Sequence, residues 1–485
     1  MSIMKEIEKE LNFTTTENGD VAYKSTLNAN LDFFGIAGAS RYRQDNVKDM
    51  FKKAMKEDLS MAVKNLFHLR SIRGGLGERE SFRTGLEKLI DKYPKVAIAL
   101  LPFIPEYGRW DDVLVYLEED ETEQIVANFI KEQLEEDLKN KREGKPITLC
   151  AKWMPSINAS NSDVRQTALK LIKLMGMDKK TYRKILSELR NGIIVEKNLT
   201  EKDYSFDYAH VPGRAFKKYL KAYRRNDNER FEEFKTKLKS GEVKAKVETL
   251  FPHEIIRDIY EGIKDLDDEA LKILWDALER SEDPKNTIVV RDGSGSMYGE
   301  PLFVATALAI LYSEQLIGDF KDKFITFSNN PRFVDLSCAE TLREKVAICR
   351  KETEIASTNI EAVYNLLYNA SLKIKDEKEY IERVVIISDM QFNCGATNVP
   401  TYESMKEKFE LAGIPLPEIV YWNVEARTVT FAADASQPNI RFVSGMSNSI
   451  ISDLIHNKSM SAYDHMIKTL SKYSFVDDML SQIQY

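Results

Sequence analysis

The sequence predicts a two-domain protein, with an N-terminal all-α helical-repeat domain at residues 1–283 and a C-terminal α/β, Rossmann-like domain at residues 284–485. The length of 485 residues exceeds the usual size of one domain. From residue 45 to about residue 280, apolar residues recur every three or four positions, which indicates amphipathic helices. From about residue 284, β-branched runs alternate with helical patterns, which is typical of a parallel sheet with helices on both faces.

The N-terminal half contains a succession of short predicted helices joined by brief turns. This arrangement favours an α-solenoid of HEAT-like repeats, although no strict period is visible. The expected helices are Leu59–Arg70, Ser81–Lys92, Val96–Ile104, Trp110–Leu117, Asn161–Met175 and Lys180–Leu189.

In the C-terminal half, the strands are expected where short apolar runs rich in Val and Ile occur. They are Thr287–Val290, Lys323–Phe327, Val384–Ser388, Glu418–Asn423 and Ile440–Val443. The intervening helices are expected at Pro301–Ile317, Leu342–Lys351, Ile360–Leu372, Tyr402–Leu411, Ser449–His456 and Ala462–Ser471. In such folds ligands bind outside the carboxyl ends of the strands, so residues that follow a strand are the first candidates for a site.

The composition is that of a soluble, globular protein, with 43% hydrophobic and 30% charged residues. Apolar runs such as Val384–Ile387 are far shorter than the roughly 20 residues that span a bilayer, and we expect neither a membrane partner nor a secretory signal. The four cysteines show no CxxC spacing, so the sequence predicts a cytoplasmic protein without disulfides or a zinc cluster; they are Cys150, Cys338, Cys349 and Cys394.

The charge is distributed unevenly along the chain. The net charge is −7, but residues 141–250 hold 26 Lys and Arg against 14 Asp and Glu, a net of +12, so the remainder carries −19. A basic segment in an acidic chain favours binding of a polyanion. The alternative is a set of solvated helix faces with no partner, and charge counting alone does not separate the two.

A candidate metal site follows the first predicted strand of the C-terminal half. Asp292, Ser294 and Ser296 place three oxygen ligands on one glycine-containing loop. Two later residues, Thr358 and Asp389, are expected at the same edge of the sheet, since Asp389 directly follows a predicted strand. Oxygen ligands alone suit a hard cation, so the sequence predicts Mg²⁺ or another divalent cation here.

Other roles for this loop are weaker. A glycine-rich turn could place its serines as caps of the next helix. A haloacid-dehalogenase phosphatase would need a second Asp where Ser294 stands. A hydrolase elbow requires the G-x-S-x-G spacing, which Gly293, Ser294 and Gly295 break. The sequence therefore predicts no catalytic residue.

The five predicted ligands together resemble the metal-ion-dependent adhesion site of von Willebrand factor A domains, whose pattern is DxSxS, a later Thr and a later Asp. The resemblance implies a von Willebrand A fold for the C-terminal domain. It also implies that the serines and the threonine contact the metal, and that the aspartates act largely through water. The remaining coordination position would take an acidic oxygen from a partner.

The helical half carries cations beside glycines and aromatics. Arg70, Arg73 and Arg79 flank a turn of three glycines, and such a turn could hold a phosphate, although a helix–helix turn with paired arginines is the alternative. Further cations neighbour aromatics in the pattern that RNA-binding surfaces use, but aromatics at helical spacing are more often core. These candidates are Lys152, Arg183, Lys184, Lys217, Lys218, Arg224 and Arg225.

The whole chain resembles a family known as domain of unknown function 2828, and more distantly the Ro ribonucleoprotein (TROVE) proteins, in which a ring of helical repeats binds RNA ends and a von Willebrand A domain closes the ring. The segments that carry the resemblance are Asn18–Tyr23, Arg70–Arg79, Tyr107–Asp112, Lys152–Pro155, Tyr182–Arg190, Val211–Tyr219, Pro252–Glu254, Ser388–Phe392 and Val420–Asn423. The resemblance implies RNA, structured or with single-stranded ends, as a partner.

The sequence thus predicts a cytoplasmic, non-catalytic RNA-binding protein with a Mg²⁺-bearing domain. The alternative is a protein-interaction scaffold, in which the metal captures an acidic side chain of a protein partner. A Mg²⁺-dependent hydrolase is the least favoured hypothesis, because neither a base nor a nucleophile stands near the predicted ligands.

Overall fold

The computed structural model describes residues 3, 7, 10–191, 195–353, 358–393, 395, 399–435, 437–457 and 460–483. The chain forms two compact units. The sheet unit comprises residues 1–69, 73–81 and 250–474, and the helical unit comprises residues 70–72, 82–249 and 475–485. This division differs from the expected boundary between residues 283 and 284, because the first 69 residues and residues 250–283 pack with the C-terminal sheet.

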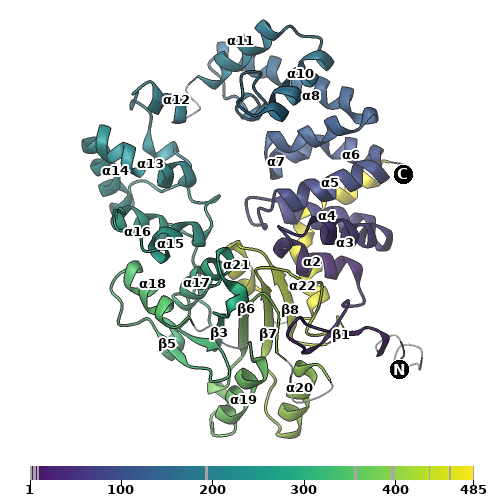
Figure 1. Ribbon diagram of the computed structural model, residues 1–485, viewed down its shortest axis with the longest axis vertical. Helices are drawn as coiled ribbons and strands as arrows, with labels where there is room; N and C mark the ends of the chain where they lie inside the picture. The colour runs from purple at the N-terminus through teal and green to yellow at the C-terminus, as the bar shows by residue number, and fades with distance from the viewer. Residues whose placement is uncertain are drawn as a thin grey trace. The chain divides into compact units, whose positions relative to one another are not determined.

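The sheet unit is built on a six-stranded sheet with the order β5-β4-β3-β6-β7-β8 (Figure 1). Its strands are β3 (Thr287–Asp292), β4 (Lys323–Phe327), β5 (Phe333–Asp335), β6 (Arg383–Ser388), β7 (Glu418–Asn423) and β8 (Ile440–Ser444). All neighbours are parallel except β5, which pairs antiparallel to β4. The prediction of a parallel sheet is therefore wrong at this edge. The chain turns back within five residues after β4, so β5 runs antiparallel to it.

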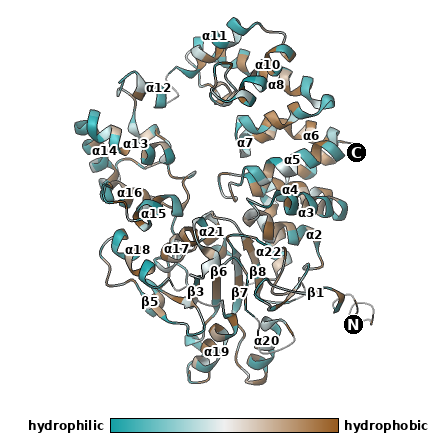
Figure 2. Cartoon of the chain, viewed as in Figure 1, coloured by the Kyte–Doolittle hydropathy of each residue, from teal (hydrophilic) through white to brown (hydrophobic). Residues whose placement is uncertain are grey.

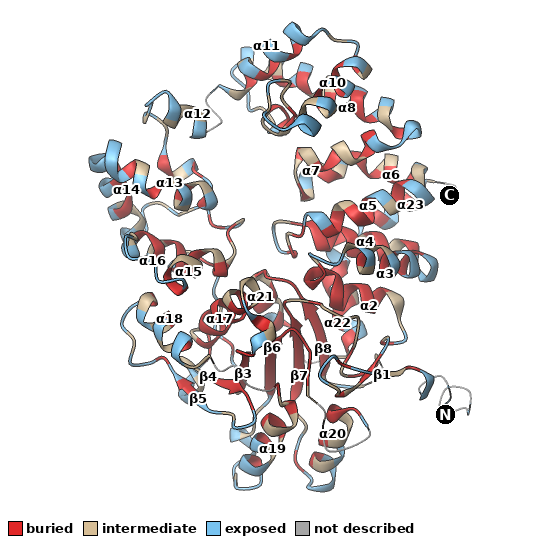
Figure 3. Cartoon of the chain, viewed as in Figure 1, coloured by how far each residue is buried: buried red, intermediate tan, exposed pale blue. Residues whose placement is uncertain are grey.

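Helices cover this sheet, and its strands other than β5 are largely hydrophobic and buried (Figures 2 and 3). The central helix α17 (Glu300–Ser313) packs against β3, β4 and β6 and is buried along nearly its whole length. This burial explains why its sequence is apolar on all sides. The other helices are α18 (Leu342–Lys351), α19 (Ile360–Ser371), α20 (Thr401–Leu411), α21 (Ser449–His456) and α22 (Ala462–Leu470), followed by the turn η8 (Ser471–Tyr473).

The N-terminal residues of the sheet unit include a short hairpin that an all-α domain would not contain. Strands β1 (Phe13–Thr15) and β2 (Val21–Tyr23) pair antiparallel, and Tyr23 forms a bridge to Phe431. The next helix, α2 (Ala29–Ile36), packs against β8. A Cβ atom at Gly38 would lie 2.7 Å from the carbonyl oxygen of Ser444, so only glycine permits this approach. The sheet unit also contains α3 (Gln44–Glu57), α4 (Leu59–Arg70), α15 (Pro252–Tyr260) and α16 (Asp268–Asp276).

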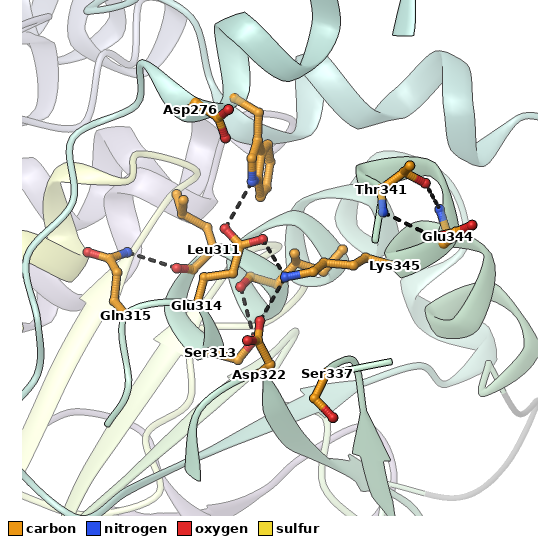
Figure 4. A network of polar contacts seen from close by, with 12 residues as sticks. Asp276, Leu311, Ser313, Glu314, Gln315, Asp322, Ser337, Thr341, Glu344 and Lys345 are labelled. Carbon is orange, nitrogen blue, oxygen red and sulfur yellow. Dashed lines mark hydrogen bonds and ion pairs between the residues drawn. The ribbon is translucent and has the colours of Figure 1, made fainter. Parts of the chain in front are cut away.

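A polar network joins α16, α17 and α18 within the sheet unit (Figure 4). Lys345 Nζ lies 2.9 Å from Glu314 Oε1 and 2.7 Å from Asp322 Oδ1. The indole of Trp275 donates to Glu314 Oε2 over 3.0 Å. Burial alone would raise the pKa of Glu314, but Arg280 and Lys345 lower it, so this buried carboxylate stays ionised. The network therefore fixes the three helices by charge as well as by packing.

The helical unit confirms the helix-rich character expected of the N-terminal half. Its longest helix, α8, contacts α6, α9, α10 and α11, and the C-terminal helix α23 returns to pack on α6. Phe475 stacks on Phe103 with a centroid distance of 4.5 Å. The helices are α5 (Glu80–Lys92), α6 (Pro94–Leu100), α7 (Ile104–Tyr107), α8 (Asp120–Arg142), α9 (Cys150–Trp153), α10 (Ser162–Leu174), α11 (Lys179–Arg190), α12 (Val195–Thr200), α13 (Gly213–Asn226), α14 (Asn228–Ser240) and α23 (Phe475–Leu480), with a 3₁₀ segment η3 (Trp110–Glu118).

Among the residues that the structure describes, none of the helices has the length and apolar character needed to cross a membrane.

Candidate metal site and basic helix faces

Two carboxylates meet at the carboxyl edge of the central sheet. Strands β3 and β6 are parallel neighbours, with Arg291 opposite Ile387. Asp292 ends β3 and Asp389 follows the last residue of β6, so both emerge at the same edge. Both side chains are fully buried. The Asp292 carboxylate accepts hydrogen bonds from the Ser294 amide over 2.8 Å and from the Ser388 hydroxyl over 2.6 Å.

The two predicted serine ligands lie together at this edge. The hydroxyls of Ser294 and Ser296 are 3.0 Å apart. Asp389 Oδ1 accepts from the Gln391 amide over 3.2 Å, whereas the buried Asp389 Oδ2 has no hydrogen-bond partner among the described residues. The nearest cation to that oxygen is Arg427, whose Nε lies 3.6 Å away and whose Nη2 donates to the Ser296 carbonyl.

The electrostatics of this edge favour a cation. Burial, together with the negative charge of Asp389, raises the pKa of Asp292 to about 6. Burial also raises the pKa of Asp389, and the nearby Ser296 hydroxyl offsets only part of this rise. A divalent ion would stabilise the ionised form of both groups. No group of three or more His, Cys, Asp or Glu side chains that could hold a metal occurs in the described part, so the oxygens would come from two carboxylates and hydroxyls.

The structure brings four of the five predicted metal ligands together: Asp292, Ser294, Ser296 and Asp389. The fifth, Thr358, is buried just before α19, and its carbonyl accepts from the Asn393 amide over 2.9 Å. Residues 354–357, which precede Thr358, lie outside the described residues. The donor set therefore fits a hard cation through the two aspartates and two serines, with Thr358 retained as a prediction.

The helix α13 carries a basic stripe that defines a second candidate site. It holds six cations and no acidic residue, while Phe216, Leu220 and Tyr223 are buried on its other side. At 3.6 residues per turn, the six cations fall within an arc of about 120° and extend along about 17 Å. They are Arg214, Lys217, Lys218, Lys221, Arg224 and Arg225, all exposed except Lys217, which is half-buried. We call these six residues the α13 stripe.

A groove beside α11 concentrates further cations of the helical unit. It has a volume of ≈ 750 Å³, and its lining includes Lys180, Arg183, Lys184, Arg190 and Lys197 against the single acid Glu188. The side chains of Arg183 and Lys184 are exposed and form no ion pair with a described residue. We call this the α11 groove. Arg190 also has a structural role, because its Nε donates a hydrogen bond to the Ala151 carbonyl over 2.8 Å.

Arg70 is not available to a phosphate. It is 2% exposed, and its Nε donates to Asp112 Oδ2 over 2.7 Å. Arg83 also binds Asp112, and a Cβ at Gly108 would lie 2.7 Å from the same carboxylate. The prediction of a phosphate contact for Arg70 is therefore wrong, because a buried carboxylate already neutralises the guanidinium.

The glycine turn after Arg70 is closed by internal hydrogen bonds. The Leu76 amide donates to the His68 carbonyl over 3.0 Å, and the Glu78 amide donates to the Leu69 carbonyl over 2.8 Å. Arg79 is exposed and pairs with Glu80 over 2.7 Å, and Arg73 is also exposed. These contacts fit the alternative of a structural turn between helices better than a phosphate cradle.

The aromatics of the basic segment are mostly core. The Tyr182 hydroxyl donates to the Pro155 carbonyl over 2.8 Å, and Tyr223 is fully buried. Trp153 and Tyr219 are exceptions, since both are half-buried. The Trp153 ring lies 4.0 Å from Arg109 Cζ and 5.5 Å from Lys152 Nζ, and the Tyr219 ring lies 5.0 Å from Lys218 Nζ. Base stacking is thus limited to such half-buried rings, while the cations remain candidates. Sequence reasoning missed Arg214 and Lys221, although their spacing of three and four from Lys217 and Lys218 indicates one helix face.

Comparison with known proteins supports the expected family. The family model named domain of unknown function (DUF2828) matches residues 16–118 and 164–290, which confirms that family resemblance. A second model, domain of unknown function (DUF7788), matches residues 286–479. An uncharacterized protein, L728, of Acanthamoeba polyphaga mimivirus is 28% identical over an aligned length of 509 residues, and the match covers 95% of this chain and 88% of that protein.

Among solved structures, the Ro (RSR) protein of Deinococcus radiodurans is similar with a TM-score of 0.35 and 11% sequence identity, over 90% of this chain and 93% of that chain. A TM-score of this size does not establish a shared fold. The von Willebrand A fold and the HEAT-like repeat therefore stay predictions, whereas the helix-rich half and the C-terminal mixed sheet are observed.

Proposed function

We propose that this protein binds RNA, without catalysis, through the basic faces of its helical unit. The observation that carries the proposal is the α13 stripe, a 14-residue helix with six cations and no acid in a chain whose net charge is −7. A chain that is acidic overall has no need of such a helix for solubility. Cations confined to one helix face supply the sequence-independent attraction that phosphate backbones require.

In the neighbouring helix α14, Glu232 and Glu233 pair within their own helix, with Lys235 over 2.8 Å and Lys237 over 2.7 Å. The α11 groove adds a second concentration of cations in the same unit. Proteins that bind single-stranded nucleic acids usually have a positively charged groove along which the sugar-phosphate backbone lies. The resemblance of the sequence motifs to Ro ribonucleoproteins favours RNA among the polyanions.

A charge-neutralised variant tests the proposal. Lys218, Lys221 and Arg225 are exposed, so replacing each by Gln removes three positive charges without opening the core. We expect the affinity for a single-stranded RNA of about 20 nucleotides to fall roughly tenfold at about 0.1 M salt, since exposed ion pairs each contribute about 0.5 kcal/mol. Filter binding or fluorescence anisotropy measures this change.

The matched control changes Lys239, Lys244 and Lys246 to Gln, which lowers the charge equally at three exposed positions outside the stripe. Its affinity should stay within about twofold of the unmodified protein. Equal losses of RNA affinity in both variants would mean that the affinity depends only on net charge. An unaltered affinity in the stripe variant would contradict the proposal.

A second function is favoured by Asp389 Oδ2, a buried oxygen with no hydrogen-bond partner among the described residues, in a site with two carboxylates. We propose that Asp292, Ser294, Ser296, Thr358 and Asp389 hold Mg²⁺ or another divalent cation, which when bound would take an acidic oxygen of a protein partner. Capture of a partner should then require Mg²⁺, disappear with a chelator and disappear in Asp292→Asn. Capture that is indifferent to both treatments would exclude this function.

A further inference from the structure

The α11 groove gathers its cations within little more than one helical turn. Lys180, Arg183 and Lys184 line the groove and stand at positions i, i+3 and i+4 of α11. At 1.5 Å per residue they span about 6 Å along the helix axis, within an arc of about 100°. Side chains at this spacing are neighbours on the surface of a helix, so three positive charges share one small area.

These three side chains are accessible from solvent. Lys180, Arg183 and Lys184 are all exposed, and none of them forms an ion pair with a described residue. On the opposite side of α11, Ile185 and Leu189 are buried and hold the helix in the unit. A ligand can therefore reach the three cations without disturbing the core.

The one acidic residue of the groove lining already has a cation beside it. Glu188 Oε1 lies 3.5 Å from Arg142 Nε, and Arg142 is not part of the lining. Lys141 Nζ donates to the Glu188 carbonyl over 2.7 Å. Both cations come from α8, so Glu188 serves the contact between α8 and α11. The groove consequently keeps an excess of positive charge.

Hydrogen bonds from α11 fix the facing wall of the groove. Arg190 Nε donates to the Ala151 carbonyl over 2.8 Å, and its Nη2 donates to the Met154 carbonyl over 2.6 Å. The Tyr182 hydroxyl donates to the Pro155 carbonyl over 2.8 Å. These contacts hold the segment that continues into the next three lining residues, Ser156, Ile157 and Asn158. Polar side chains thus stand across the groove from the cations in a wall that is held in place.

The start of α11 is an unfavourable place for positive charge. The helix dipole favours acidic residues in the first turn, but the first turn of α11 holds Lys179 and Lys180 and no acid. The amides of Lys180 and Thr181 donate to the Asp178 side chain, so the helix end is already capped and only side chains are left for a ligand. Natural sequences break such local rules of stability at functional sites.

We propose that the α11 groove binds a terminal phosphate, that is, a phosphate monoester. A phosphodiester carries one negative charge, whereas a monoester carries about −1.5 to −2 at pH 7 and offers three oxygens that accept hydrogen bonds. Three cations within about 6 Å match the monoester, because each ammonium or guanidinium group can bind a different oxygen of the same phosphate. The groove volume of ≈ 750 Å³ also admits the nucleoside that carries the phosphate.

The α13 stripe differs from the groove in the way its cations are arranged. It extends along about 17 Å of helix, an arrangement suited to the successive diesters of a strand. The groove therefore recognises a chemical group that the stripe does not distinguish. The inference rests on the proposed RNA binding only where the phosphate belongs to the 5′ end of an RNA; a free phosphorylated compound supplies the same group without it.

The experiment compares three RNA strands by fluorescence anisotropy with the full chain. They are a strand of about 20 nucleotides with a 5′-phosphate, the same strand with a 5′-hydroxyl, and a 5′-hydroxyl strand longer by two nucleotides. We expect the phosphorylated strand to bind roughly tenfold more tightly than the hydroxyl strand of equal length. The longer strand adds about the same charge as diesters and should gain no more than about twofold. Equal gains from the phosphate and from the two nucleotides would contradict the proposal.

A pair of substitutions in the groove tests where this preference arises. Arg183→Gln with Lys184→Gln should reduce the preference for the phosphorylated strand from about tenfold to about twofold or less. The control, Lys139→Gln with Lys173→Gln, removes two exposed cations of the same unit outside the groove and should keep the preference. An unchanged preference in the groove variant would overturn the proposal.

The α13 stripe variant separates this inference from the proposed function. It should bind all three strands more weakly and keep the preference for the 5′-phosphate, whereas failure of the proposed function would leave its affinity unaltered. Titration calorimetry with uridine 5′-monophosphate and uridine then identifies the source of the phosphate. Binding of the monophosphate alone, lost in the groove variant and without a preference among the strands, supports the site with a free phosphorylated compound as its ligand. No preference among the strands together with no monophosphate binding at millimolar concentration would overturn it.

Discussion

Asp292 and Asp389 occupy the ends of two adjacent parallel strands, and burial together with the charge of Asp389 raises the pKa of Asp292 to about 6. The folded state therefore opposes ionisation of the two buried carboxyl groups at this edge. The one described cation beside them is the Arg427 guanidinium, which is still partly exposed. Repulsion between such groups disfavours the folded state unless a cation compensates it.

Added Mg²⁺ should therefore stabilise the sheet unit. At a concentration about 100 times the dissociation constant, one bound ion adds about 2.7 kcal/mol to the free energy of unfolding. Asp292→Asn should lose this stabilisation, and Asp276→Asn, which changes an exposed carboxylate paired with Lys272, should retain it. Differential scanning fluorimetry with and without Mg²⁺ measures the effect. An identical shift in both variants would point to nonspecific binding.

Arg427 should compete with a divalent ion for this edge. Its Nε lies 3.6 Å from Asp389 Oδ2, so it supplies part of the positive charge that the carboxylates need. Arg427→Gln removes that charge, and we expect roughly fivefold tighter binding of Mg²⁺, a modest gain because the side chain is partly exposed to solvent. Titration calorimetry gives the two dissociation constants. Weaker binding in the variant would mean that Arg427 supports the site and does not compete for it.

The buried pair of Arg70 and Asp112 should dominate the stability of its part of the helical unit. Arg70→Met leaves Asp112 buried with Arg83 as its remaining cation, and we expect a loss of about 3 kcal/mol. Arg79→Met breaks an exposed pair with Glu80 and should cost less than about 1 kcal/mol. Urea denaturation followed by circular dichroism compares the two. Equal losses would contradict the structural role given to Arg70.

Asp20 should make stability depend on pH. It is 4% exposed, and burial raises its pKa to about 6 although the hydroxyl of Thr401 donates to it over 2.8 Å. The folded state therefore holds this proton more tightly than the unfolded state, whose carboxyl has a pKa near 3.8. The free energy of unfolding should fall as the pH rises from about 4 to about 6. In the variant Asp20→Asn, the free energy of unfolding should depend less on pH in this range. An unchanged pH dependence would mean that other groups cause it.

Local patterns predicted the five parallel strands and most helix positions. The residues Thr287–Val290 and Val384–Ser388 are apolar and β-branched, and both lie in central strands. Strand β5 escaped prediction because it has only three residues and two of them, Phe333 and Asp335, are exposed. The docking of α2 on β8 depends on contacts between residues about 400 positions apart, which no local pattern encodes.

The site residues, like the fold, could be predicted only in part. The positions of Asp292 and Asp389 at strand ends followed from the sequence, because parallel neighbours end at one edge. The burial of Arg70 could not be predicted, since it depends on Asp112 from a later helix. His465, Thr469 and Lys472 share a helical spacing that could have indicated one face, but only the fold shows that this face lines a cavity beside β8.

The measurement that tests the central claim most directly is the salt dependence of RNA binding for the unmodified protein and for the variant Lys218→Gln, Lys221→Gln, Arg225→Gln. If the six cations of the α13 stripe contact phosphates, the logarithm of the association constant should fall with the logarithm of salt concentration with a slope of about −4. The variant should show a slope of about −2, because three contacts are lost. A slope near zero in the unmodified protein, or equal slopes in both proteins, would contradict RNA binding through this helix.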